Sequence, residues 1–188
     1  MSKATTKIAI AFAFKELLME KPLNKITVND ITDKCEINRQ TFYYHFHDIF
    51  ELTEWICEED AKQALENKKT FETWQEGFLS IFEMIKADKT FITNIYRHLR
   101  SDYLYRYLYR VTYNRLYVVI EEQASGMVVR DEDKEFIANF YKYAFVGLVL
   151  EWIDKGMEED PKIIIERLNS LIQGSLRHAL NNARLNRL

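Results

Sequence analysis

Residues that interrupt helices are scarce in this chain of 188 residues, which contains five glycines and two prolines. Glycine and proline destabilise the interior of a helix more than any other residue, so a helix is forced to end in few places. Hydrophobic residues make up 47% of the sequence, which is ample for a packed core. Apolar residues also recur at helical spacing, as in Ile10, Ala13, Phe14 and Leu17. The sequence therefore predicts an all-α protein.

A helix-turn-helix, two short helices joined by a tight turn, is predicted by the stretch ITVNDITDKCEINRQTFYYHF. Thr27 is a favoured N-cap for the first helix, and Asp30 can complete a capping box with it. Asn38 can cap the second helix in a similar way. Phe42 and Phe46 lie one turn apart, so they can anchor the second helix to a core.

The side of the second helix that faces away from these phenylalanines is rich in hydrogen-bond donors and aromatic rings. Such a helix suits insertion into the major groove of DNA, whereas the ordinary alternative is a solvated face. Arg39 and Gln40 lie nearest the helix N-terminus and would contact base edges, favouring guanine and adenine respectively. Tyr43, Tyr44 and His47 would meet phosphates or thymine methyl groups. The outward residues are Arg39, Gln40, Thr41, Tyr43, Tyr44 and His47, and DNA contacts are also expected from the caps Thr27 and Asn38.

The run INRQTFYYHF, residues 37–46, resembles the DNA-binding domain of TetR-type regulators, as does the opening Thr27-Val28-x-Asp30-Ile31. The resemblance is strong over about residues 8–60 and extends to the rest mainly as a helical pattern. It implies a three-helix DNA-binding head and a helical body that usually holds a ligand in a cavity. His45 matches a family position that often contacts phosphate, although a structural histidine is the alternative.

A narrower resemblance, to the branch of dihydroxyacetone-kinase regulators, rests on residues 38–46 and on Glu54-Trp55-Ile56. It suggests a metabolite of the dihydroxyacetone type, but such a molecule is small and polar and matches a large aromatic cavity poorly. Two positions depart from the family pattern. Glu36 stands where a turn glycine is usual, and a left-handed backbone would be strained there. Ile49 stands where a lysine usually meets phosphate.

Charge is distributed unevenly along the chain. Residues 1–47 contain 7 Lys/Arg and 5 Asp/Glu, whereas residues 48–188 contain 19 and 24. A mildly basic head on an acidic body suits a protein that touches DNA at one end only. We therefore expect a helix-turn-helix DNA-binding domain over residues 1–47 and a helical effector-binding and dimerisation domain over residues 48–188.

Several other classes of protein do not fit the sequence. Cys35 and Cys57 lack the spacing of a zinc site, so we expect no disulfide, metal or cofactor and a reducing cytoplasm. Residues 8–14 lack a signal-peptide cleavage site, and we expect no stretch with the ~20 apolar residues of a membrane span. A Gly-rich phosphate loop and a Gly-x-Ser-x-Gly elbow are also missing from the sequence, so an enzyme is not expected. A helical interaction protein that does not bind DNA is a remote alternative.

The helix expected over about residues 132–155 is apolar on two sides, which requires packing partners on both. A further single helix is expected from Pro161 to about Ala179, after the start signal Asp160-Pro161. Gly147 and Gly174 would let helices approach closely. We therefore expect a homodimer through these two helices. The residues expected at this dimerisation face are Phe140, Tyr143, Gly147, Leu150, Leu168, Leu171 and Ile172.

The body is expected to receive a signal, and two routes are open. A small-molecule effector, which we favour, would lie in a cavity lined by Trp55, Trp74, Phe78 and Tyr103. Alternatively these bulky side chains fill the space, and a protein co-regulator docks on the Tyr/Arg-rich helix expected over about residues 102–124. Arg106 and Arg110 would then matter most. An ordinary surface of cation–π pairs is the third possibility.

Overall fold

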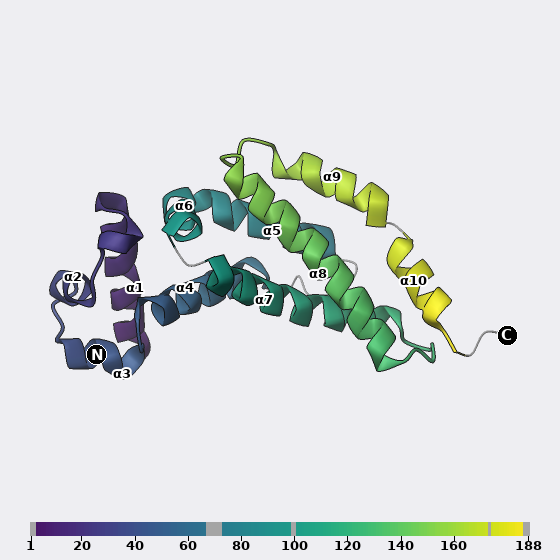
Figure 1. Cartoon of the computed structure of the whole chain (residues 1–188), viewed down its shortest axis with the longest axis horizontal. Coiled ribbons are helices and arrows are strands. Elements are labelled where there is room, and N and C mark those ends of the chain that lie inside the picture. Colours follow the sequence, from purple (N-terminus) through teal and green to yellow (C-terminus); the bar gives the residue numbers. More distant parts are fainter. Residues whose placement is uncertain (1–2, 67–72, 99–100, 173, 186–188) are drawn as a thin grey trace. The chain divides into compact units, whose positions relative to one another are not determined.

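The computed structural model describes residues 3–66, 73–98, 101–172 and 174–185, with only the backbone described for residues 3 and 101–104 (Figure 1). The described residues contain helices and no strand, which confirms the all-α prediction. In chain order the elements are α1 (Lys3–Glu20), the 3-10 helix η1 (Leu23–Lys25), α2 (Val28–Lys34), α3 (Arg39–His45), α4 (Ile49–Ala64), α5 (Trp74–Ala87), α6 (Lys89–His98), α7 (Ser101–Gln123), α8 (Asp131–Asp154), α9 (Pro161–Ile172) and α10 (Ser175–Ala183).

The chain folds as two compact units. The first comprises Met1–Gln63 and Ala87–Leu104, and the second comprises Ala64–Lys86 and Tyr105–Leu188. The first unit therefore holds α4 and α6 together with the N-terminal helices, because both supply side chains to the same core. From the sequence we expected the DNA-binding domain to end at residue 47. That boundary separates two functions and not two compact units, and it stays a prediction.

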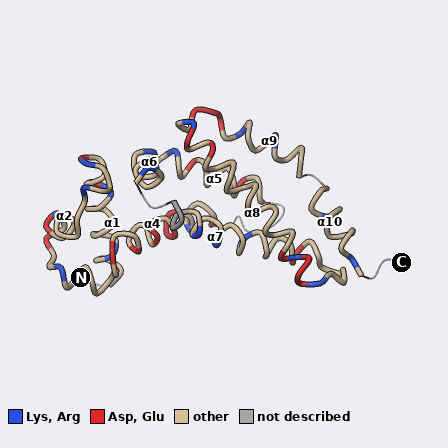
Figure 2. The backbone as a smooth tube through the Cα atoms, viewed as in Figure 1, with Lys and Arg blue, Asp and Glu red and all other residues tan. Residues whose placement is uncertain are grey.

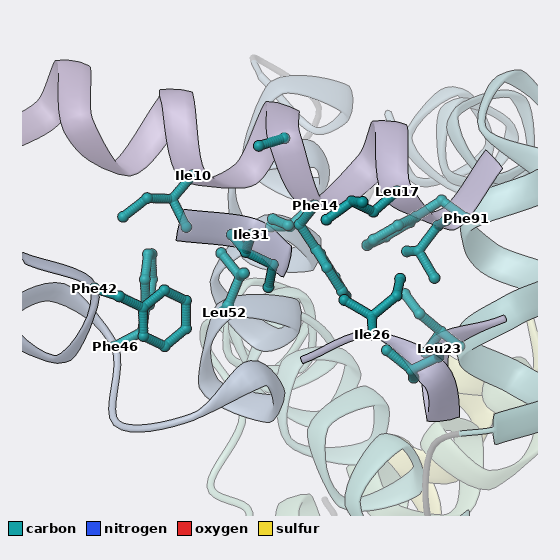
Figure 3. Close-up of a cluster of buried hydrophobic side chains, with 14 residues drawn as sticks. Ile10, Phe14, Leu17, Leu23, Ile26, Ile31, Phe42, Phe46, Leu52 and Phe91 are labelled. Carbon is teal, nitrogen blue, oxygen red and sulfur yellow. The ribbon is translucent and has the colours of Figure 1, made fainter. Parts of the chain in front are cut away.

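The core of the first unit is a cluster of aliphatic and aromatic side chains from α1, η1, α2, α3, α4 and α6 (Figure 3). Helix α1 contributes Ile10, Phe14 and Leu17, at the spacing predicted for its buried face. The ring of Phe91 on α6 meets the ring of Phe14 edge-on, with centroids 6.2 Å apart. Leu52 on α4 is fully buried in the same cluster. The helix-turn-helix thus rests on a core that α4 and α6 share.

Lys15 joins α1 to two other helices of the first unit. Its ammonium nitrogen lies 2.9 Å from Asp60 Oδ2 on α4 and 2.8 Å from Oδ2 of Asp88, the residue before α6. Burial alone would lower the pKa of Lys15, but hydrogen bonds with Asp88 and Asp60 outweigh it and raise that pKa. This ion cluster supplements the apolar contacts among α1, α4 and α6.

Aromatic rings of α5 and α8 pack edge-on in the second unit. The ring centroid of Phe78 lies 4.5 Å from that of Phe145 and 5.0 Å from that of Phe82. Phe82 in turn lies 4.8 Å from Trp152. The indole nitrogen of Trp152 donates a 2.8 Å hydrogen bond to the carbonyl oxygen of Glu159, which ties α8 to the start of α9. Figure 1 shows α9 and α10 returning beside α8.

The prediction of a single helix from Pro161 to about Ala179 is wrong, because α9 ends at Ile172 and α10 begins at Ser175. Gly174 between them has a φ of +80°, a left-handed conformation that favours glycine and interrupts a helix. A Cβ atom at Gly174 would meet no atom of this chain within 4 Å, so within the chain this glycine serves the turn, and a close approach of a partner's helix there stays a prediction.

By length and composition alone, α8 is a helix that could cross a membrane, contrary to the expectation from the sequence. Half of its most apolar window is buried inside the chain, as in the core helix of a globular domain. Figure 2 shows that its charged residues gather mainly towards its two ends. Packing inside the chain therefore explains why the buried side of α8 is apolar. It does not explain the apolar residues on the exposed side.

Candidate nucleic-acid interface

The first helix of the helix-turn-helix, α2, begins with the capping box predicted from its sequence. The Thr27 hydroxyl oxygen accepts a 3.2 Å hydrogen bond from the backbone N–H of Asp30, and the Thr27 N–H donates to Asp30 Oδ2 at 2.7 Å. The ammonium group of Lys21 lies 2.8 Å from Asp30 Oδ1. The hydrogen bond with Lys21, followed by those with Thr27, lowers the pKa of Asp30 to about 2. The carboxylate is therefore ionised at neutral pH and holds the start of α2.

The turn between α2 and α3 has the left-handed residue that the sequence led us to expect. Glu36 has a φ of +54°, and such a backbone costs a residue with a Cβ atom free energy that glycine avoids. Cys35 caps the C-terminus of α2 and packs, half-buried, against the core of the first unit. The backbone N–H of Ile37 closes the turn with a 3.0 Å hydrogen bond to the carbonyl oxygen of Thr32.

Helix α3 is divided into a buried and an exposed side, as predicted. Phe42 is completely buried, with its ring centroid 6.0 Å from that of Phe46. Tyr43 and Tyr44 are 49% and 63% exposed, whereas the aromatic rings of a hydrophobic core are mostly buried. Arg39 and Gln40 are exposed at the N-terminal end of the same helix.

Arg39 and Tyr43, one turn apart, form a pair on the exposed side. The Arg39 guanidinium carbon lies 5.8 Å from the Tyr43 ring centroid, and Nη2 donates a 3.3 Å hydrogen bond to the phenolic oxygen. Stacking and the hydrogen bond restrict the rotamers of a long side chain, so less entropy is lost when the guanidinium meets a base or a phosphate. The pair is therefore arranged to present donors outward.

Three predicted contact residues are already used in caps. Asn38 Oδ1 accepts the N–H of Thr41 at 2.8 Å and its hydroxyl at 3.0 Å, which confirms Asn38 as the N-cap of α3. The Thr27 hydroxyl donates to Asp30 Oδ2 at 2.7 Å. The structure therefore assigns these three side chains a local role, and their contact with DNA stays a prediction.

The two histidines at the end of α3 differ in exposure. His45 is half-buried, with its ring centroid 5.0 Å from that of Tyr44. His47 is exposed, and its backbone N–H donates a 2.5 Å hydrogen bond to Glu51 Oε2. The N–H of Glu51 donates in turn to Asp48 Oδ1 at 2.8 Å, so Asp48 caps the start of α4. Of the two histidines, His47 is the more exposed.

The predicted effector-site residues are distributed over both compact units, and whether they line one cavity stays a prediction. Trp55 lies in the first compact unit, with its ring centroid 5.7 Å from that of Phe46. Trp74 and Phe78 lie in the second, where both contact Phe145 at centroid distances of 5.9 and 4.5 Å. The side chain of Tyr103 lies outside the described residues. The rings of Trp74 and Phe78 are therefore part of a packed aromatic cluster.

Arg106 and Arg110, the predicted docking residues, are exposed on α7. The Arg110 guanidinium carbon lies 5.8 Å from the ring centroid of the buried Tyr107. The charged guanidinium of Arg110 near the buried ring of Tyr107 fits the expected Tyr/Arg-rich surface. Docking of a protein on this surface stays a prediction.

The predicted dimerisation face is exposed only in part. Phe140, Tyr143 and Leu171 are 63%, 57% and 75% exposed, and Gly147 is also exposed, with open space where a Cβ atom would lie. Leu150, Leu168 and Ile172 are buried or half-buried in the chain's own core, so they have little surface left for a partner. Phe136, absent from the predicted face, is 74% exposed and extends it along α8.

Two basic side chains acquire roles that local sequence does not reveal. The Lys7 ammonium lies 5.0 Å from the ring centroid of Phe46 and 5.3 Å from that of Trp55. Lys142 is 9% exposed within α8. In the sequence, the only sign of these roles is that each lysine lies on a helical stripe that is otherwise apolar. Among the described residues, no cluster of His, Cys, Asp and Glu is suited to a metal ion.

Two family models match the chain. Residues 13–54 match bacterial regulatory proteins of the tetR family, and residues 72–174 match a transcriptional regulator C-terminal region. A curated relative, the HTH-type dhaKLM operon transcriptional activator DhaS of Lactococcus lactis subsp. lactis, is 27% identical over 154 residues, which cover 80% of this chain and 81% of that protein.

Solved structures share the fold. The dihydroxyacetone kinase operon activator DhaS has a TM-score of 0.71 at 24% identity, with 92% of this chain and 97% of that one covered. NalD, the secondary repressor of the MexAB-OprM multidrug efflux pump in Pseudomonas aeruginosa, has a TM-score of 0.59 at 15% identity over 100% of both chains. The repressor AlkX from Dietzia sp. has a TM-score of 0.55 at 15% identity, with 97% of this chain and 99% of that one covered.

Proposed function

Because the chain belongs to the TetR family of DNA-binding transcriptional regulators, we propose that it recognises an operator sequence through the exposed face of α3. The chain is not an enzyme. In the proposed complex α3 enters the major groove, with Arg39 and Gln40 at base edges and Tyr43, Tyr44 and His47 at phosphates or thymine methyl groups. The remaining contacts are proposed for the caps Thr27, Asn38 and Thr41 and for His45.

The observation that carries this proposal is the two-sided character of α3. Phe42 is completely buried, whereas Tyr43 directly after it is 49% exposed and holds the guanidinium of Arg39. Apolar burial on one side fixes the helix, and hydrogen-bond donors on the other side read the groove. Within the first compact unit, this face combines exposed rings with exposed donors.

We further propose that the chain acts as a homodimer, joined through the exposed apolar stripe of α8 and the neighbouring part of α9. Phe136, Phe140 and Tyr143 on α8 and Leu171 on α9 are all more than half exposed. Contiguous apolar surface of this kind usually marks an interface. Two copies of α3 would then meet half-sites separated by roughly 34–36 Å, or a multiple of it.

The second unit is proposed to receive a small-molecule effector that changes the affinity for DNA. The chain resembles a relative named for a dihydroxyacetone kinase operon, so we propose that its own operator controls genes of dihydroxyacetone metabolism. We place the protein in the cytoplasm, where its operator would be. A protein co-regulator on the exposed Arg106 and Arg110 is a second candidate, because the rings of Trp74 and Phe78 already pack against Phe145.

Retention of sheared genomic DNA tests the proposed function. The wild-type protein is expected to retain a few promoter fragments, and the genes beside them would name the pathway. The matched control is Arg39→Ala, which should retain none of them while keeping the same helix content. If both proteins retained the same fragments, or if the wild type retained all fragments equally, recognition through α3 would be wrong.

A further inference from the structure

Lys7, near the start of α1, places a positive charge against two aromatic rings. Its ammonium nitrogen lies 5.0 Å from the ring centroid of Phe46 and 5.3 Å from that of Trp55. Both distances are within the ~6 Å over which the face of a ring attracts a cation. The three residues belong to the first compact unit, so α1, the end of α3 and α4 meet around one charge.

This charge is not neutralised within the described part of the chain. Other lysines of the first unit form ion pairs with carboxylates at 2.6–2.9 Å, namely Lys15, Lys21, Lys34 and Lys62. No carboxylate lies at ion-pair distance from Lys7 among the described residues. Ring faces are weak acceptors, so the N–H donors of the Lys7 ammonium group remain available to an anion.

The two rings also hold the ammonium group in place. Phe46 is 1% exposed, and its ring centroid lies 5.7 Å from that of Trp55, so the rings form a packed platform. The side chain of Lys7 is half-buried, whereas that of Lys25 in the same unit is exposed. Contact with the platform restricts the rotamers of the long lysine side chain, which reduces the entropy lost on binding.

The platform lies at the C-terminal end of α3. Phe46 directly follows this helix, and its backbone N–H donates a 2.9 Å hydrogen bond to the carbonyl oxygen of Phe42. Figure 3 shows the rings of Phe42 and Phe46 together beside Ile10, which lies one turn after Lys7 on α1. The charge of Lys7 therefore lies next to the last turn of α3.

The end of α3 lies towards the DNA backbone in the proposed complex. Arg39 and Gln40, at the N-terminal end of α3, are proposed to meet base edges in the major groove. Helix α3 has seven residues and is therefore about 10 Å long, while the groove is about 12 Å wide. The opposite end of the helix is then close to the rim of the groove, which phosphates form.

We propose that Lys7 binds a phosphate of the operator backbone beside the end of α3, with its ammonium group positioned by Phe46 and Trp55. Lysine binds phosphate as a point charge, and such a contact carries no base information. Lys7 therefore sets affinity and salt dependence, whereas Arg39 and Gln40 set the choice of sequence. The inference rests on the proposed function, because it adds a contact from α1 to operator recognition by α3.

The salt dependence of DNA binding tests this contact. The logarithm of the association constant falls with the logarithm of salt concentration, with a slope of about −0.9 for each phosphate neutralised on B-DNA. Fluorescence anisotropy of the full-length protein with a retained operator fragment gives this slope between about 50 and 200 mM NaCl. Lys7→Met is expected to reduce the magnitude of the slope by about 0.9 for each half-site, which corresponds to an affinity about eightfold lower at 0.1 M salt.

Matched variants make the test specific to the charge of Lys7. Lys7→Met keeps a long apolar stem on the platform, and its melting temperature shows whether the fold is intact. Lys7→Arg keeps both the charge and the contact with the rings, so it should retain the wild-type slope. Lys162→Met, which removes an exposed lysine of α9 in the second unit, should also leave the slope unchanged. Equal slopes for wild type and Lys7→Met, or a loss that Lys7→Arg shares, would overturn the proposal. Lys7→Gln carries the same expectation if Lys7→Met fails to fold.

A scrambled DNA sequence of the same length separates this inference from the proposed function. Lys7→Met should weaken binding to the operator and to the scrambled DNA by the same factor, because both carry the same phosphates. Arg39→Ala should weaken operator binding far more. A loss in Lys7→Met that is confined to the operator would overturn the phosphate contact. A wild-type protein that binds both sequences equally would contradict the proposed function itself, whereas an unchanged slope in Lys7→Met leaves that function intact.

Discussion

The ammonium group of Lys15 on α1 lies 2.9 Å from a carboxylate oxygen of Asp60 on α4, 45 residues further along the chain. The same nitrogen lies 2.8 Å from Asp88 Oδ2, before α6. One lysine therefore holds the ends of two helices against the helix that supports the helix-turn-helix. Its side chain is 30% exposed, so these ion pairs are partly shielded from water.

Lys15→Met should lower the free energy of unfolding by about 1–2 kcal/mol, between the values for exposed and buried ion pairs. The loss arises because two carboxylates are left without their partner. Urea denaturation checks this, with Lys25→Met as the control, since Lys25 is exposed and no ion pair is found for it among the described residues. Equal midpoints for the two variants would contradict a stabilising role for the cluster.

Arg39→Ala should abolish specific DNA binding and leave thermal stability nearly unchanged, because the side chain points away from the core. Loss of a good base contact costs ~1–3 kcal/mol per half-site. The matched control is Phe42→Ala, which should destabilise the protein by ~3–5 kcal/mol because the ring is completely buried. Fluorescence anisotropy with operator DNA and thermal melting provide the two measurements. Similar melting temperatures for both variants would show that the division of α3 into two sides is wrong.

Glu36→Gly should stabilise the protein by about 0.5–1 kcal/mol. The left-handed backbone of Glu36 costs roughly 1–2 kcal/mol, part of which glycine loses again through the greater freedom of the unfolded chain. Glu36→Ala retains a Cβ atom and should give no such gain, so it separates backbone strain from loss of charge. Chemical denaturation of both variants measures the difference. A gain equal for alanine and glycine would point to charge instead of strain.

Asp30→Asn should lower the melting temperature at pH 6 by an amount that shrinks as the pH approaches 2. The folded pKa of Asp30 is about 2, below its ordinary value of 3.8. The carboxylate therefore adds stability that is fully present above about pH 3.8 and is lost as the pH falls through about 2. Melting curves from pH 6 to pH 2 check this. Asp33→Asn on the same helix, where no ion pair is found among the described residues, should show no such convergence.

Phe140→Glu should convert the proposed homodimer into a monomer and weaken operator binding. A carboxylate in the centre of an apolar interface would have to be desolvated without a partner. Sedimentation velocity at micromolar concentration measures the oligomeric state. Val118→Glu places the same charge at an exposed position of α7, outside the proposed interface, and should remain dimeric. A wild-type monomer with full operator affinity would overturn the dimer.

Local chemistry made the helix-turn-helix predictable from the sequence. Caps join residues two or three positions apart, so Thr27 with Asp30 and Asn38 with Thr41 could be paired without a fold. The burial of Phe42 followed from helical periodicity, and the left-handed turn at Glu36 followed from the family pattern.

The tertiary structure alone decided which distant residues meet. Nothing in the local sequence pairs Lys142 with Tyr109 and Tyr113, because such a contact depends on how α8 packs against α7. Periodicity showed that α8 is apolar on two sides, but burial had to be known before Phe140 could be separated from Leu150. The break at Gly174 was missed for a related reason: a glycine fits a helix at modest cost, and its backbone angles are set by the packing around it.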